Sequence, residues 1–302
     1  MEPGAEPEAG PEPEAPTLTA REALRRAAPL LTRRPILIVS DFDGTIAQIK
    51  IDPWAAAIDR AARRALRRLA ALDGVVVAFL SGRTALDLAG RARVGGARYL
   101  GNHGMERAAL RRGARAETLD VDLPDASGAP GRMAELVADG VPRLVTDAWL
   151  VVERKPPAVA FHYRGAPDVA AAGERVRGAT DRLDPEALLE RFQGKRVLEL
   201  RPAGAPGKDD AVRALIDEVR PRACFLLGDD RTDAAAFAIL SAARAEGRTN
   251  GLAIGVHGHH DVAPDVARWA DVMLASPIEA GRFLAGLARL LGATARQPKA
   301  RD

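Results

Sequence analysis

The stretch PILIVSDFDGTIAQI (residues 35–49) runs from five apolar residues, through one serine, into two carboxylates, Asp41 and Asp43, that are one residue apart. A short apolar run of this kind is typical of a strand that is buried on both faces of a parallel sheet. Two negative charges at the end of such a strand are unfavourable unless something compensates them. The compensating group is therefore the first thing to look for in the rest of the chain.

The chain has 302 residues, of which 47% are hydrophobic and 28% charged, which predicts a globular protein with one large or two modest cores. Its one cysteine, Cys224, lies in the apolar run ACFLLGDD, where core packing is favoured over a reactive thiol and no intrachain disulfide can form. The chain shows no secretory signal and no run of ~18 apolar residues. We therefore expect a cytoplasmic protein with no membrane partner.

The first residues, MEPGAEPEAGPEPEAP, have the composition of a disordered acidic tail, which we predict over residues 1–20. They contain five glutamates and no lysine or arginine, so a net charge of +3 for the whole chain leaves +3 + 5 = +8 for the remainder. This surplus favours an anionic ligand. In RAARRALRRLAAL (60–72) most arginines point away from the apolar stripe, which indicates a solvated helix face, and we expect no nucleic-acid partner.

Apolar runs alternate with amphipathic segments before residue 106 and again after residue 207, which predicts an α/β fold with a Rossmann-like, doubly wound parallel sheet. We assign residues 34–106 and 207–302 to this core. The intervening residues 107–206 are predicted to form an inserted, smaller α/β cap domain. Within the cap, the alternation in VAFHYR and VLELR predicts strands with one solvent-exposed face.

Polar clusters follow four of the predicted core strands: DFDGT, SGRT, GNHG and GDDRTD. In open α/β sheets, ligands bind beyond the carboxyl ends of the strands, so these clusters are expected to converge on one edge. Two unit charges ~4 Å apart repel by about 4 kcal/mol at an effective dielectric near 20. A hard divalent cation, Mg²⁺, removes that repulsion. The carboxylates concerned are Asp41, Asp43, Asp229, Asp230 and Asp233.

These residue types suit phosphoryl transfer. The Asp41 carboxylate can attack phosphorus, and Asp43 can pass a proton to the departing oxygen. The Ser81 hydroxyl and the Lys208 ammonium can hold the phosphoryl oxygens. Each motif alone also fits a turn, a helix cap or a solvated loop, but their order after successive strands favours the functional interpretation.

DFDGT, SGR, the isolated Lys208 and GDDRTD, in this order, resemble the four motifs of the haloacid-dehalogenase-like phosphohydrolases. The wordings DFDGTIAQI, GNHGMER and GDDRTDAAAF resemble the trehalose-6-phosphate phosphatases in particular. The resemblance covers residues 34–291. It extends to the cap, where Glu153 and Lys155 form an ExK motif that a following HYR (162–164) completes. The departures are Ile46 and Gln48, which replace the more usual Leu and Pro.

The resemblance implies a role for each site residue. Asp41 would become an aspartyl-phosphate, and Asp43 would act as the acid and base. The Asp41 carboxylate, the Asp43 carbonyl and Asp229 would bind Mg²⁺, with Asp230 and Asp233 orienting them. Ser81 and Lys208 would hold the phosphoryl group. The expected substrate-binding residues are Gly82, Arg83, Asn102 and His103, where core and cap meet, and Glu153, Lys155, Glu199, His162 and Arg164 in the cap.

The resemblance therefore implies Mg²⁺-dependent hydrolysis of trehalose 6-phosphate to trehalose and phosphate. The alternatives are a phosphatase for sucrose phosphate or a mannosyl-phosphoglycerate, and a non-catalytic sugar-phosphate sensor. The expected partner is a small sugar phosphate, in a monomer or weak oligomer, and we also consider a functional link to a trehalose-phosphate synthase. The histidines of GVHGHHD (255–261) are interpreted as part of a mobile loop rather than a soft-metal site.

Overall fold

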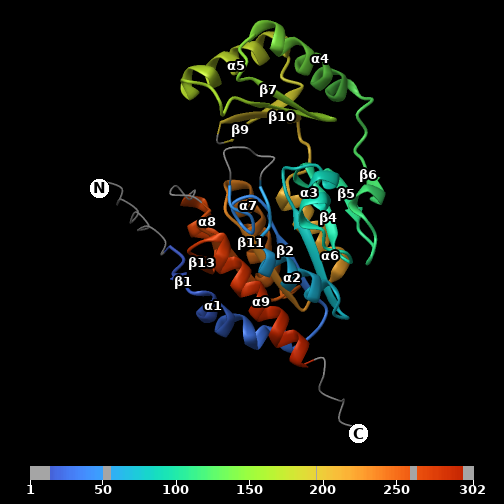
Figure 1. Cartoon of the computed structure of the whole chain (residues 1–302), viewed down its shortest axis with the longest axis vertical. Coiled ribbons are helices and arrows are strands. Elements are labelled where there is room, and N and C mark those ends of the chain that lie inside the picture. Colours follow the sequence, from blue (N-terminus) through green and yellow to red (C-terminus); the bar gives the residue numbers. More distant parts are fainter. Residues whose placement is uncertain (1–13, 50–55, 195, 259–263, 295–302) are drawn as a thin grey trace, which may run out of the picture.

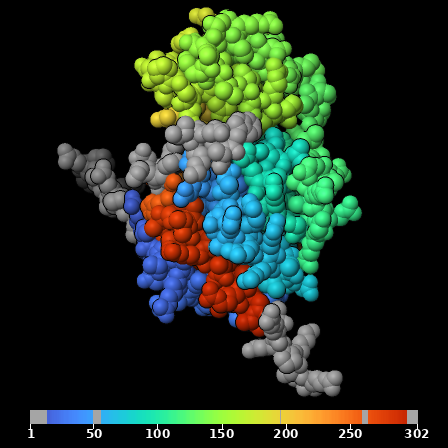
Figure 2. All heavy atoms as spheres, viewed as in Figure 1, coloured from blue at the N-terminus to red at the C-terminus, as the bar shows by residue number. Residues whose placement is uncertain are grey.

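The computed structural model describes residues 14–49, 56–194, 196–258 and 264–294. Their strands form two separate sheets, one of nine strands and one of four. Figure 1 shows the smaller sheet and its two helices stacked on the larger unit, and Figure 2 shows this cap as a distinct lobe. The predicted α/β class, with a parallel-dominated core sheet, is confirmed.

The core sheet has the strand order β1-β13-β12-β11-β2-β3-β4-β5-β6. All neighbours from β1 to β4 are parallel, and β5 and β6 continue the sheet in antiparallel pairs. The apolar run at residues 36–40 is β2, a central strand buried along its whole length. The bounds are β1 Thr17–Leu18, β2 Ile36–Ser40, β3 Val75–Leu80, β4 Arg98–Gly101, β5 Glu106–Ala109, β6 Val121–Asp122, β11 Ala223–Gly228, β12 Gly251–Val256 and β13 Val272–Leu274.

Helices cover both faces of this sheet because successive β2 residues point to opposite sides. Ile36 and Ile38 pack with α1, α2, α3 and α9, whereas Leu37 and Val39 pack with α6, α7 and α8. Within the described residues, no helix has the length and apolarity needed to span a bilayer. The helices are α1 Ala20–Ala27, α2 Arg60–Ala70, α3 Ala85–Ala92, α6 Lys208–Val219, α7 Arg231–Ala245, α8 Pro264–Trp269 and α9 Pro277–Thr294, with short 3₁₀ turns η1 Ala28–Thr32, η3 Asn102–Gly104 and η4 Ala116–Thr118.

The cap is an antiparallel sheet with the order β7-β8-β10-β9 and two helices on the face that points away from the core (Figure 1). Phe161 and Leu198 are among the side chains buried between this sheet and its helices. The elements are α4 Ala129–Leu144, β7 Val151–Lys155, β8 Ala158–His162, α5 Val169–Leu183, β9 Leu189–Gly194 and β10 Val197–Pro202.

The prediction that β8 and β10 each expose one face to solvent is wrong. They are the two central strands of the cap sheet, and all but their end residues are buried. The helices cover one face, and the core lies against part of the other, where Glu199 contacts His103. A polar residue in an alternating strand can thus face a second lobe instead of water.

Two predicted boundaries also differ from the structure. The cap was expected from residue 107, but β5 pairs with β4, and β6 pairs with β5, so residues 107–122 extend the core sheet. The tail was expected up to residue 20, but β1 pairs with β13 and α1 begins at Ala20. Thr19 and Glu22 form a capping box at that helix start, a signal that the sequence carries as TxxE.

Gly101 is required where β4 passes the start of α3, because a Cβ at this position would lie 2.1 Å from the Ala85 nitrogen. We predict that Gly101→Ala lowers the free energy of unfolding by roughly 2–3 kcal/mol through overpacking. The matched control is Gly90→Ala inside α3, where a Cβ meets nothing within 4 Å, and it should be neutral or stabilising by up to ~1 kcal/mol. Urea denaturation followed by circular dichroism measures both, and equal stability of the two variants would contradict this packing.

Candidate active site

The predicted polar clusters meet at the carboxyl edge of the core sheet. Asp41 follows β2 directly, and its main-chain nitrogen donates to the Leu227 oxygen of β11 at 2.9 Å, which fixes it beside the loop that carries Asp229. Lys208 is the first residue of α6 and only 2% exposed. Its Nζ donates to Asp41 Oδ1 at 2.9 Å and to Asp233 Oδ1 at 2.8 Å.

Asp41, Asp229 and Asp233 form a cluster whose carboxylate oxygens lie within 4.8 Å of one another. Thr45 Oγ1 donates to Asp229 Oδ1 at 3.0 Å and makes a longer contact of 3.4 Å to Asp41 Oδ2. Together with Asp230, these are four carboxylates against the single ammonium of Lys208, a formal charge of −4 + 1 = −3. Clustered hard oxygen donors with an excess negative charge fit a divalent cation such as Mg²⁺.

Burial shifts the titration of this cluster. It raises the pKa of Asp41 to about 7, although the Lys208 ammonium acts in the opposite direction. It also raises the pKa of Asp229 well above its usual value, and the neighbouring Asp233 and Asp230 add to that shift. For Lys208, burial alone would lower the pKa, but the surrounding carboxylates outweigh it and the pKa is raised. The carboxylates therefore favour a positive ligand.

Asp230 and Asp233 shape the loop before α7. Asp233 Oδ2 accepts from the nitrogens of Asp229 at 3.1 Å and of Asp230 at 3.2 Å, and Asp230 caps the helix in return. Asp230 is 53% exposed and lies 3.8 Å from Lys208. The structure thus brings all the predicted acidic residues of this loop to the site, with Asp230 at its outer edge.

Asp43 and Arg83 form a bidentate ion pair beside the cluster. Arg83 Nε donates to Asp43 Oδ2 at 2.5 Å, and Nη2 donates to Oδ1 at 2.8 Å. Arg83 Nη1 also donates to Asp87 Oδ2 at 2.8 Å. The sequence reading missed Asp87, although its spacing of four residues from Arg83 on a predicted helix is a signal for such a pair.

The loops after β3 and β4 place Ser81, Gly82, Asn102 and His103 next to one another. The main-chain oxygen of Ser81 accepts a hydrogen bond from the main-chain nitrogen of His103 at 2.9 Å. A Cβ on Gly82 would lie 2.6 Å from His103 Nε2. Asn102 and His103 have positive φ angles of 47° and 59°, a conformation that is uncommon for residues other than glycine. Such strain persists where surrounding contacts hold it, often at functional sites.

The cap contributes Lys155 and Glu199, both buried where the two lobes meet. Lys155 Nζ donates to Glu199 Oε1 at 2.9 Å and to the Gly82 oxygen at 3.1 Å. Glu199 Oε2 lies 3.1 Å from His103 Nε2, and Asn102 Nδ2 donates to the Lys155 oxygen at 3.1 Å. Burial would raise the pKa of Glu199, but Lys155 and His103 lower it well below its usual value, so Glu199 remains ionised.

The other predicted cap residues lie nearby but apart from this cluster. His162 Nε2 is 2.9 Å from Glu153 Oε2 on the neighbouring strand, and both side chains are about a quarter exposed. Arg164 follows β8, and its pKa is lowered by burial and by Arg196, while the negative charge of Asp43 raises it.

Two glycines that lie against the carboxylate cluster were also not predicted from the sequence. Gly44 has a φ of 84°, and a Cβ there would lie 2.1 Å from Asp229 Oδ2. A Cβ on Gly258, in the GVHGHHD stretch, would lie 2.6 Å from the same oxygen. His257 of that stretch lies 3.3 Å from Thr17 Oγ1. His259 and His260 fall outside the described residues.

Glu106 was not predicted either, although it lies in the GNHGMER motif. Its buried carboxylate accepts from the Ala85 nitrogen at 2.6 Å, which ties β5 to the start of α3 and so to the Ser81–Thr84 loop. We predict that Glu106→Ala lowers the free energy of unfolding by about 1–3 kcal/mol because the Ala85 N–H loses its acceptor, and that Glu106→Gln loses less.

Urea denaturation checks this prediction. The control is Glu117→Ala, an exposed glutamate further along the same segment, which should change stability by less than ~0.5 kcal/mol. Equal effects at positions 106 and 117 would show that the Glu106 contact does not stabilise the fold.

Comparison with known proteins places the chain in a family. The family model for trehalose-phosphatase matches residues 39–263. Relatives include the trehalose-phosphate phosphatase of Mycobacterium avium, 35% identical over 281 residues that cover 89% of this chain and 66% of the relative. An uncharacterized glycosyl hydrolase of Mycobacterium tuberculosis is 34% identical over 266 residues, which cover 86% of this chain but 19% of that protein. The chain thus spans less than two thirds of these relatives.

Solved structures agree on the fold. The C-terminal domain of the C. albicans trehalose-6-phosphate phosphatase superposes with a TM-score of 0.72 at 22% identity, over 91% of this chain and 98% of that one. A haloacid dehalogenase-like hydrolase from Bacteroides thetaiotaomicron superposes with a TM-score of 0.50 at 16% identity, over 85% and 98% of the two chains. With a family model that matches most of its length, this chain belongs to the trehalose-phosphatase family.

Proposed function

We propose that this chain is a Mg²⁺-dependent phosphatase that hydrolyses trehalose 6-phosphate to trehalose and phosphate. The observation that carries the proposal is the buried cluster in which Lys208 holds Asp41 beside Asp229, at the carboxyl edge of the core sheet. A buried, oriented carboxylate next to a fixed cation suits a nucleophile for phosphorus. The family match and the curated phosphatase relatives support the substrate.

Asp41 would act as the nucleophile. Lys208 binds Oδ1, so Oδ2 is the oxygen left to attack, and the fixed position lowers the entropic cost of reaching the phosphoryl group. A bond forms between Asp41 Oδ2 and phosphorus, which gives an acyl phosphate, the bond from phosphorus to the sugar oxygen breaks, and that oxygen takes a proton from Asp43. In the second step Asp43 takes a proton from water, the resulting hydroxide attacks phosphorus, and the Asp41 carboxylate leaves.

The ion pair between Arg83 and Asp43 limits when Asp43 can give up or accept a proton in these two steps. The bidentate pair places a guanidinium N–H on each carboxylate oxygen of Asp43, so the pair occupies both oxygens that would carry a proton. The first step needs a protonated Asp43, so the ion pair has to open before the sugar oxygen leaves. Asp87, which also binds Arg83, gives the guanidinium a partner when that happens.

The carboxylates of Asp41 and Asp229, with the main-chain oxygen of Asp43, would hold Mg²⁺. When bound, the ion would neutralise the carboxylates and the charge that develops on the phosphoryl oxygens. Asp233 would act indirectly, because its two oxygens already bind Lys208 and the main chain of the loop. Ser81, buried at the end of β3, is in place to donate its hydroxyl to the phosphoryl group.

The sugar would bind where Lys155 and Glu199 meet His103. Buried polar atoms in native proteins nearly always have partners. Yet Asn102 Oδ1 and His103 Nδ1 are buried and have none among the described residues. Hydroxyl groups of a disaccharide can bind these atoms and can compete for Lys155 and Glu199. Such polar contacts penalise a sugar that lacks the matching hydroxyl.

The test of this function is a panel of sugar phosphates assayed for released phosphate, with Mg²⁺ and with EDTA. We expect trehalose 6-phosphate to give the highest kcat/KM and EDTA to abolish release. Asp41→Asn should lower kcat by at least ~10⁴-fold while leaving the melting temperature within a few degrees of the parent protein.

The outcomes separate the alternatives. Preference for sucrose phosphate or a mannosyl-phosphoglycerate would refute the substrate but keep the chemistry. Binding of trehalose 6-phosphate without turnover would indicate a sensor, and full activity of Asp41→Asn would refute the mechanism. The cytoplasmic location, the monomeric or weakly oligomeric state and the link to a synthase stay predictions.

Lys155 is expected to act on substrate binding. We predict that Lys155→Ala raises KM at least ~10-fold, because the ammonium is buried against Glu199 and Gly82 where the sugar would bind. The control is the next residue, Arg154→Ala, whose exposed side chain pairs with Glu135 and Asp139 on the far side of the strand. Steady-state kinetics measures both, and an unchanged KM in Lys155→Ala would remove this residue from the substrate site.

A further inference from the structure

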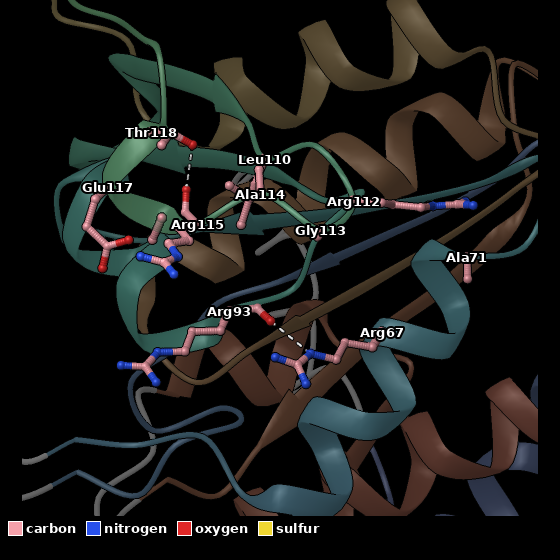
Figure 3. Close-up of a pocket in the computed structure, with 12 residues that line it drawn as sticks. Arg67, Ala71, Arg93, Leu110, Arg112, Gly113, Ala114, Arg115, Glu117 and Thr118 are labelled. Atoms are coloured by element: carbon pink, nitrogen blue, oxygen red, sulfur yellow. Dashed lines mark hydrogen bonds between the residues drawn. The ribbon is translucent and has the colours of Figure 1, made fainter.

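A pocket of about 840 Å³ opens on the core away from the candidate active site. It lies between the carboxyl-terminal ends of α2 and α3 and the segment that follows β5 (Figure 3). These helix ends lead into the amino ends of β3 and β4, so the pocket is at the opposite edge of the sheet from Asp41. A six-residue strand such as β3 separates the two edges by roughly 20 Å.

Four arginines line this pocket: Arg67, Arg93, Arg112 and Arg115. Figure 3 shows Arg67, Arg93 and Arg115 at one end and Arg112 extending toward Ala71 at the other. The remaining lining includes Leu110 and several alanines, so the charged groups surround an apolar floor.

These arginines are fixed in place without being neutralised. Arg67 Nε donates to the Arg93 oxygen at 2.9 Å, Arg93 Nε to the Gly90 oxygen at 2.8 Å, and Arg112 Nη2 to the Ala70 oxygen at 2.8 Å. Within the part of the chain that the structure describes, none of the four pairs with a carboxylate. Elsewhere on the surface such pairs are common, as at Arg154, Arg175 and Arg248.

Stabilisation of the helix ends explains part of this arrangement but not all of it. Each carbonyl contact uses one guanidinium N–H of the five that arginine carries. The carboxyl-terminal ends of two helices supply about −0.5 charge each, and Glu117 supplies −1. When the charges of the four arginines are added to those of these groups, the pocket keeps a net charge of about +2. The neighbouring Arg63 is affected as well, because burial and then the charges of Arg67 and Arg93 lower its pKa.

We propose that this pocket binds a small molecule in which two or more phosphate groups are joined to an apolar ring system, the chemistry of a nucleoside di- or triphosphate. The unpaired guanidinium groups match phosphate oxygens in bidentate geometry. Ala71, Ala114 and Ala116 give the ring an apolar surface to lie on, and the volume is in the usual range for small-molecule sites. The site is independent of the proposed phosphatase activity.

Isothermal titration with ATP tests the proposal, with EDTA present and with uncharged adenosine as the comparison ligand. We expect one ATP per chain and no measurable binding of adenosine. Arg67→Gln combined with Arg93→Gln should weaken ATP binding at least tenfold. The control combines Arg64→Gln with Arg68→Gln, exposed residues of α2 that do not line the pocket, and should change binding less than twofold.

Two further variants sharpen the result. Arg115→Gln removes a charge that makes no side-chain hydrogen bond among the described residues, so it should weaken ATP binding without altering the melting temperature. Glu117→Gln removes the opposing charge and should tighten binding about two- to fivefold. The proposal is overturned if ATP does not bind, if adenosine binds equally well, or if the pocket and control pairs weaken binding to the same extent.

Discussion

The candidate active site depends on one arrangement, in which several carboxylates lie close to a single buried ammonium. Asp41 lies beside Asp229 and Asp233 because two neighbouring strands, β2 and β11, end at the same edge of a parallel sheet, and Lys208 is the cation placed among them. One positive charge cannot balance them, and burial disfavours their ionised forms, which raises the pKa values of Asp41 and Asp229. The sheet thus holds together a site that favours both a divalent cation and the transfer of a phosphoryl group.

The cap is connected to this site through polar rather than apolar contacts. Lys155 reaches the Gly82 oxygen, and Glu199 reaches His103, so each lobe supplies part of one buried network. Polar networks of this kind can exchange partners at modest cost when a hydroxyl-rich ligand takes their place, whereas a large apolar interface would resist opening. In the proposed reaction, the junction of core and cap would bind the sugar and the core would perform the chemistry.

Much of the core and its acidic cluster could be predicted because the information is local. The motifs of Asp41, Ser81 and Asp229 each follow an apolar strand, and the rule that parallel strands end at one edge then brings these three residues together. The burial of Lys155 and Glu199 could not be predicted this way, since it depends on how closely two lobes approach. The two-residue strand β1 has no periodicity to detect, and β5 and β6 join the core sheet through a pairing that their own sequence does not specify. Glu106 and Asp87 matter through contacts with other residues of the fold. Only the spacing of four residues between Arg83 and Asp87 was a signal that the sequence carries.

The carboxylate cluster would act as a cation site that prepares Asp41 for attack on phosphorus. Anomalous diffraction from crystals grown with Mn²⁺, which substitutes for Mg²⁺ at oxygen sites, tests it most directly. We expect one anomalous peak in contact with carboxylate oxygens of both Asp41 and Asp229, and no such peak in crystals of Asp229→Asn. A cluster that holds no cation at millimolar Mn²⁺, or a peak bound only by exposed carboxylates elsewhere, would contradict it.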